Sequence, residues 1–113
     1  MVSRWVVTTP LGHRVGLSED GWKHKILVSH PEFATNPNYE LELRLALQGP
    51  EFIVEGWSGE LLNLRWCPTA PGKPKYVCAV YREVKPLGFV ITAFFISRHA
   101  KLLRRTVLWQ KSP

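Results

Sequence analysis

The sequence predicts an α+β domain in which two N-terminal helices pack on one face of an antiparallel sheet of four to five strands, in the order β-α-α-β-β-β-β. Apolar residues recur at helical spacing between residues 19 and 48 and at a period of two after residue 50. The 113 residues match one domain, 1–113. A chain of this size buries roughly two-thirds of its unfolded surface, so its aromatic residues can form a core without disulfide bonds.

The first strand and the first helix are separated by a turn-rich segment. Residues 2–8 (VSRWVVT) are rich in β-formers and predict a strand. Ser18 or Asp20 can cap a helix over about 19–29, because a short polar side chain accepts hydrogen bonds from the free N–H groups of the first turn. Pro31 then disfavours continuation of this helix.

A second helix is expected over about 39–48 (YELELRLALQ). Leu43 and Leu47 lie four residues apart, so they share one helical face. The Gly49-Pro50 pair is a typical stop signal, because glycine suits the C-terminal cap and proline cannot continue the helix.

After residue 50 the alternation of apolar and polar residues predicts strands. The turn Ser58-Gly59 joins the first two in a hairpin. The tail after residue 98 is ambiguous between a basic helix and a strand, and its Val and Trp residues favour a turn followed by a strand. The expected strands cover 52–57, 60–66, 75–83, 89–97 and about 103–109.

If the connections between these strands are simple hairpins, the strand periodicity assigns each side chain to a face of the sheet. One face is apolar and is expected to carry the helices; it holds Leu62, Leu64, Trp66, Cys78, Val80, Ile91, Ala93 and Phe95. The other face mixes polar and aromatic residues: Asn63, Arg65, Ala79, Tyr81, Thr92 and Phe94. Thr92 is notable there, because it lies within the most apolar strand.

Charge is distributed very unevenly along the chain. Residues 1–60 contain five Lys/Arg and eight Asp/Glu, a net charge of −3, whereas residues 61–113 contain ten Lys/Arg and only Glu83, a net charge of +9. A basic half attracts a polyanion such as nucleic acid. A solvated basic surface, or a patch that meets an acidic protein, explains the same charge.

The remaining composition argues against several classes. Cys67 and Cys78 are too few for a secreted disulfide scaffold, and without a Cys/His quartet a structural zinc site is not expected. No segment is apolar and long enough for a signal peptide or a membrane span. We therefore expect a cytoplasmic protein without membrane contact, cofactor or metal, and either a monomer or a homodimer.

Four histidines supply candidate proton-transfer groups. His24 and His30 are six residues apart in the first helix, so they point to different sides and cannot form a metal-binding pair one turn apart. His24, near the middle of the helix, is the better catalytic candidate, and His30 before Pro31 can anchor the helix end. His13 and His99 are expected at the surface.

An ordered series of short motifs resembles the phage- and toxin-associated barnase–EndoU–colicin–RelE-like (BECR) nuclease group. The motifs are Trp22-Lys23-His24, His30-Pro31-Glu32, Gln48-Gly49-Pro50, Gly59-Glu60-Leu61-Leu62 and Ile91-Thr92-Ala93-Phe94-Phe95. They span about residues 20–97 in the order that this group would show. The proline-rich loop after residue 67 and the Trp66-Cys67 pair depart from the usual pattern.

The resemblance implies a metal-independent, toxin-like endoribonuclease with a helix-borne histidine, a strand-borne basic residue and a strand Ser or Thr converging on RNA. Carried over, the catalytic residues are His24, Arg65 and Thr92. Second candidates are His30, Tyr81 and Arg82, and Lys75 could replace Arg65. An acidic antitoxin or immunity protein is an expected partner.

Each of these residue types fits cleavage of RNA by its own 2′-hydroxyl. A histidine can remove or deliver the proton, an arginine can hold two phosphate oxygens, and a threonine hydroxyl can donate to the phosphate. Trp66, Tyr81 and Phe94 could stack on unpaired bases. The expected phosphate-binding cations are Lys73, Lys75, Arg98, Lys101, Arg104 and Arg105. The alternative is a non-catalytic module of the same fold that binds nucleic acid or a protein.

Overall fold

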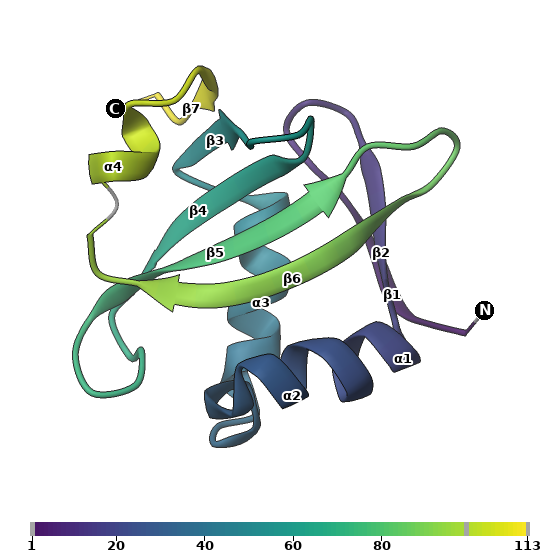
Figure 1. Ribbon diagram of the computed structural model, residues 1–113, viewed down its shortest axis with the longest axis vertical. Helices are drawn as coiled ribbons and strands as arrows, with labels where there is room; N and C mark the ends of the chain where they lie inside the picture. Colours follow the sequence, from purple (N-terminus) through teal and green to yellow (C-terminus); the bar gives the residue numbers. More distant parts are fainter. Residues whose placement is uncertain (1, 99, 113) are drawn as a thin grey trace.

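A computed structural model describes residues 2–98 and 100–112 of the chain (Figure 1). In chain order the elements are β1 (Ser3–Thr8), β2 (Arg14–Ser18), α1 (Glu19–Gly21), the π-helical turn η1 (Trp22–Ile26), α2 (Leu27–Ser29), the 3-10 turn η2 (Pro31–Ala34), α3 (Asn38–Gln48), β3 (Phe52–Glu55), β4 (Leu61–Cys67), β5 (Lys75–Arg82), β6 (Gly88–Ile96), α4 (Ala100–Leu103) and β7 (Val107–Gln110).

In the described part of the chain, the strands form one sheet of seven in the order β1-β2-β6-β5-β4-β3-β7. All neighbouring strands are antiparallel except β2 and β6, which run parallel and pair at Val15–Gly88 and Gly16–Phe89. The α+β class is confirmed, but the expected antiparallel sheet of four to five strands is wrong. The missed strand β2 is short and contains Gly16, so its sequence is typical of a turn.

The two helices predicted near the N-terminus match the structure only in part: helical residues cover 19–29 and 38–48, but two strands precede the first stretch, and the 3-10 turn η2 lies between the two. α1, η1 and α2 form one helical segment over residues 19–29, and Ser18 caps it by accepting a hydrogen bond from the Gly21 amide (2.9 Å). The π-helical turn η1 starts with Trp22 and ends with Ile26, and both side chains are buried. α3 ends at Gly49 as predicted.

The sheet separates two apolar layers, which define its two faces. Figure 1 shows α3 crossing behind β4, β5 and β6, and we call this side the helix face. Its core includes Leu43 and Leu47 of α3 packed with Val77, Ala79 and Tyr81 of β5. The opposite side, here the outer face, carries the second apolar cluster of Leu62, Leu64, Cys78, Val80 and Leu102.

The helices therefore cover the face opposite to the one expected. Asn63 and Arg65, predicted on an open polar face, point toward α3, and the Asn63 side chain is buried with its Nδ2 donating to the carbonyl of Leu47 (3.3 Å). The predicted apolar face is the outer face, and it is covered in part by Leu102 of the short helix α4. The tail thus contains both a helical turn and a final strand.

A β-bulge changes the register of β6. Tyr81 pairs with Val90, but the preceding residue of β5, Val80, pairs with Thr92, so β6 has one extra residue between the two pairs. Because successive strand residues point to opposite faces, one inserted residue reverses the faces of everything beyond it. Thr92 and Phe94 consequently lie on the outer face, whereas Ala93 and Phe95 pack in the helix-face core.

Candidate functional site

Arg65, the predicted basic catalytic residue, is used to join β4 to the end of α3. Its Nη1 donates to the carbonyl of Gly49 (3.0 Å), and its Nε lies 3.9 Å from the carboxylate of Glu42. About a third of the side chain is exposed. Its position at the C-terminus of α3 is favourable for a cation, because the last carbonyls of a helix carry partial negative charge.

The three residues predicted to form the ribonuclease centre are not brought together. Arg65 pairs with Val77 and points to the helix face, whereas Thr92 pairs with Val80 and points to the outer face. The sheet itself separates the guanidinium from the hydroxyl. His24 is largely exposed on η1 (74 % of its side chain), and the nearest acid is Asp20 at 3.9 Å.

His30, the second candidate, lies against the outer face. It lies between α2 and η2, and its ring centroid is 6.0 Å from that of Phe94. Its Nδ1 is 3.4 Å from the carboxylate of Glu32, and about a third of the side chain is exposed. Of the two helix histidines, His30 is therefore the one with a described contact to the face that carries Thr92.

Tyr81, expected to stack on a base, is fully buried in the helix-face core. Its hydroxyl lies 2.8 Å from Nδ1 of His13, so the histidine expected at the surface is instead half-buried against β5. Burial raises the pKa of Tyr81, and the Thr9 hydroxyl opposes this by hydrogen bonding. These three side chains attach the β1–β2 turn to the sheet, and Tyr81 is not accessible to a ligand.

Arg82, another second candidate, closes the turn between β3 and β4. Its Nη1 donates to the carbonyl of Ser58 (3.2 Å), and its Nη2 is 3.6 Å from the Glu60 carboxylate. Glu60 also accepts hydrogen bonds from the Ser58 hydroxyl (2.7 Å) and from the Trp57 amide. These hydrogen bonds, the one from Ser58 first, lower the pKa of Glu60 to about 2. The arrangement stabilises the hairpin turn, and Arg82 is part of it.

The six cations predicted to bind phosphate divide into two groups. Lys75 Nζ donates to the carbonyl of Pro71 (2.6 Å), and Arg105 donates to the carbonyls of Glu55 and Gly56, so both serve the fold. The other four are exposed, and within residues 2–98 and 100–112 they have no ion pair: Lys73, Arg98, Lys101 and Arg104. His99 lies outside the described residues.

Side chains from four adjacent strands form a row across one end of the outer face. Trp66 of β4 pairs with Tyr76 of β5, which pairs with Ile96 of β6. The Trp66 and Tyr76 rings are 5.1 Å apart in an edge-to-face arrangement, and Phe52 of β3 lies 6.4 Å from Tyr76. Trp66 is 42 % exposed. We call Phe52, Trp66, Tyr76 and Ile96 the aromatic row.

Cations and one acid flank the aromatic row. Arg98 follows Ile96 by two residues, and Lys73 lies in the loop that joins Trp66 to Tyr76 along the chain. The carboxylate of Glu51 accepts a hydrogen bond from the Trp66 amide. Burial, and then the charge of Glu51, raise the pKa of Tyr76.

The sequence named Trp66 as a stacking residue but missed Tyr76 and Phe52. The signal for them was available, because residues 64 and 66 and residues 76, 78 and 80 alternate onto the same apolar face. Within the described part of the chain, no group of three or more His, Cys, Asp or Glu side chains could hold a metal ion. No described helix is long and apolar enough to cross a membrane.

Comparisons with protein-family models, curated proteins and solved structures gave no match.

Proposed function

We propose that the protein binds single-stranded RNA on the outer face of its sheet. The observation that carries this proposal is the aromatic row: exposed Trp66 beside Tyr76 and Ile96, on three adjacent strands, with uncommitted cations around it. Unpaired bases stack on aromatic side chains, and each stacked base contributes about 1–3 kcal/mol. Duplex RNA hides its bases, so the same surface discriminates against it.

Phosphate contacts supply the rest of the proposed affinity. Lys73 and Arg98 lie at the end of the sheet that carries the row, and Lys101 and Arg104 project from the segment around α4. Leu102 anchors this segment on the outer face, since its side chain is buried against the Val54–Leu62–Leu64 cluster. The cations are thus held by an apolar contact and need no ion pair for their placement.

Fluorescence anisotropy with a labelled oligouridylate tests the proposal. We expect binding that weakens steeply with salt and that an unlabelled single strand competes away, while a duplex of equal length competes poorly. An oligodeoxythymidylate arm measures whether the 2′-hydroxyl contributes. No binding at about 50 mM salt, or equal competition by the duplex, would reject the proposal.

Cleavage of the bound RNA is a second candidate function, favoured by one observation. The His30 ring lies against Phe94 on the outer face, which also carries the Thr92 hydroxyl. A histidine can accept the proton of the attacking 2′-hydroxyl or protonate the leaving 5′-oxygen, and a threonine can donate a hydrogen bond to the phosphate. In this proposal His30 takes the role predicted for His24, and Arg65 has none.

Incubation of RNA with the protein in EDTA tests this second function separately from binding. We expect cleavage between about pH 5 and 8, because an imidazole changes charge in this range. Intact RNA in the presence of bound protein would reject cleavage and leave the binding proposal standing.

A further inference from the structure

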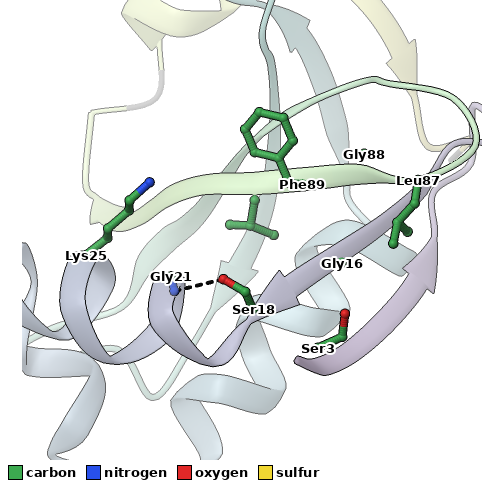
Figure 2. Close-up of a pocket in the computed structure, with 9 residues that line it drawn as sticks. Ser3, Gly16, Ser18, Gly21, Lys25, Leu87, Gly88 and Phe89 are labelled. Carbon is green, nitrogen blue, oxygen red and sulfur yellow. Dashed lines mark hydrogen bonds between the residues drawn. The ribbon is translucent and has the colours of Figure 1, made fainter. Parts of the chain in front are cut away.

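The parallel strands β2 and β6 separate directly after they pair, and a cavity of about 210 Å³ opens where they part. The chain leaves β2 at Ser18 and turns into the helical segment 19–29, while β6 continues along the sheet. Figure 2 shows the cavity between this helical segment and β6. Its lining residues include Gly16 of β2, Gly21 of the helical segment, and Phe89 and Val90 of β6.

Among the described residues, the backbone edge of β6 beside the helical segment has no strand partner after Phe89. β2 covers only Gly88 and Phe89, whereas β5 pairs with the other edge from Phe89 to Ile96. In an antiparallel pair, alternate residues turn their N–H and C=O groups away from the partner strand. The helical segment 19–29 lies beside this edge of β6. Within the described residues, it makes no backbone hydrogen bond to the edge. Such an edge is a template for an added strand.

The cavity is lined by one cation, Lys25. Figure 2 shows its side chain extending from the helical segment toward β6. Lys25 has no ion pair within the described residues. Of the acids nearby, Glu19 pairs with Arg4 (3.0 Å), and Asp20 lies 3.9 Å from the His24 ring. The groove therefore has a positive charge that remains available for an acidic group.

We propose that the groove between β6 and the helical segment 19–29 binds an extended acidic segment of a partner protein as an added strand on β6. Main-chain hydrogen bonds to the free edge provide affinity, and pockets for particular side chains provide specificity. The cavity is smaller than the 300–1,000 Å³ typical of sites for drug-sized ligands, so it suits one apolar side chain of the added strand. A neighbouring Asp or Glu side chain of the same segment pairs with Lys25.

Peptides selected from a random library displayed on phage, and then synthesised with both ends blocked, test this inference. We expect the selected peptides to combine apolar residues in alternation with at least one acid, and to protect backbone amides of residues 91–96 from hydrogen exchange. Blocked ends remove the charge of the C-terminal carboxylate. If binding still requires an acid, that acid is an Asp or Glu side chain. Peptides that bind without protecting these amides would overturn strand addition.

Charge reversal supplies the residue-level test. Lys25→Glu should weaken the selected acidic peptide about tenfold, and a peptide with its acid changed to Lys should recover affinity for this variant. The matched control is Lys23→Glu, because Lys23 is exposed on the same helical segment and does not line the cavity. Equal losses in the two variants, or no rescue by the reversed peptide, would overturn the pairing with Lys25.

A variant that narrows the cavity tests whether an apolar side chain of the peptide enters it. A Cβ added at Gly16 meets its nearest neighbours, the Val6, Leu87 and Ser3 side chains, at 3.6–3.7 Å, so Gly16→Ala fits without strain. We expect this variant to keep its thermal unfolding midpoint and to bind the selected peptide at least severalfold more weakly. Unchanged affinity would show that the cavity holds no peptide side chain. Concentration-dependent dimerisation that blocks peptide binding would show that a second copy occupies the edge instead.

Discussion

Arg65 and Thr92 project from opposite faces of the same sheet. Arg65 pairs with Val77 on the helix face and Thr92 pairs with Val80 on the outer face, so the backbone layer of the sheet lies between the two functional groups. A single groove on one face of the sheet therefore cannot contain both groups. The outer face combines Thr92 with Phe94, His30 and the aromatic row.

Removal of the exposed indole of the aromatic row should weaken RNA binding. We expect Trp66→Ala to raise the Kd for oligouridylate about tenfold, because a stacked base contributes about 1–3 kcal/mol. Trp57→Ala is the matched control, since Trp57 is 71 % exposed but lies on the β3–β4 turn over Arg105. Anisotropy titrations compare the two. A similar loss in both variants would contradict a specific role for the row.

Removal of the cations around α4 should change the salt dependence of binding. Each phosphate contact with a single strand contributes about 0.7 to the slope of log K against log salt concentration. The double change Lys101→Ala and Arg104→Ala should therefore make this negative slope shallower by about 1.4. Arg14→Ala with Lys23→Ala removes two exposed cations from the acidic half of the chain and should leave the slope unchanged. Titrations at several salt concentrations measure both.

The two helix histidines should differ in the cleavage assay. We expect His30→Ala to lower the rate of RNA cleavage in EDTA by about 10²–10⁴-fold, as for loss of a general acid or base. His24→Ala should have little effect, because that side chain is 74 % exposed on η1. Both variants should keep their affinity for an uncleavable oligodeoxynucleotide. The reverse pattern would restore the assignment to His24.

Glu40 should be important for stability. Its carboxylate accepts two hydrogen bonds from Arg4 (both 2.7 Å) and one from the Trp5 indole (2.9 Å), which joins α3 to β1. Arg4 lowers the pKa of Glu40, so the charged form is the stabilising one. Glu40→Gln should lower the free energy of unfolding by about 2 kcal/mol. Urea denaturation measures this, with Glu42→Gln, which removes only a 3.9 Å ion pair to Arg65, as the control.

Glu60 should make the fold sensitive to acid. Its pKa is lowered from about 4.5 to about 2, so its stabilising contribution is complete above pH 4.5 and is lost as the pH falls toward 2. Glu60→Gln should be less stable than the wild type at pH 7, and the difference should shrink near pH 2. Thermal unfolding across this range measures it. Glu83→Gln, at an exposed position, should follow the wild-type curve; a Glu60→Gln curve parallel to wild type would contradict the assignment.

Much of the secondary structure follows from local signals. The helix over 19–29 with its Ser18 cap, the helix that ends at Gly49, and the β3–β4 turn with Gly59 at a φ of +89° were all predictable, because each depends on a few neighbouring residues. Burial of Cys78 was predictable too, from its place in an apolar alternation. The charge of the second half and the stacking role proposed for Trp66 also came from sequence alone.

The arrangement of candidate site residues did not follow from these signals. The extra residue between Val90 and Thr92 has no sequence mark of its own, yet it moves Thr92 to the other face. The parallel pairing of β2 with β6 joins segments that are far apart in the chain, and the cavity beside Lys25 exists only because of it. The use of Arg65 and Arg82 to bind backbone carbonyls was equally invisible, since a free arginine and a committed one have the same sequence context.

By itself, the sequence determined the approximate positions of the helical stretches 19–29 and 38–48 and of most strands, and which half of the chain is basic, because caps, turns and periodicity act over a few residues. Only the tertiary structure decided which face each strand residue occupies and which cations remain free. Both depend on pairing between distant segments. In β6, a single inserted residue moves Thr92 and the residues after it to the opposite face.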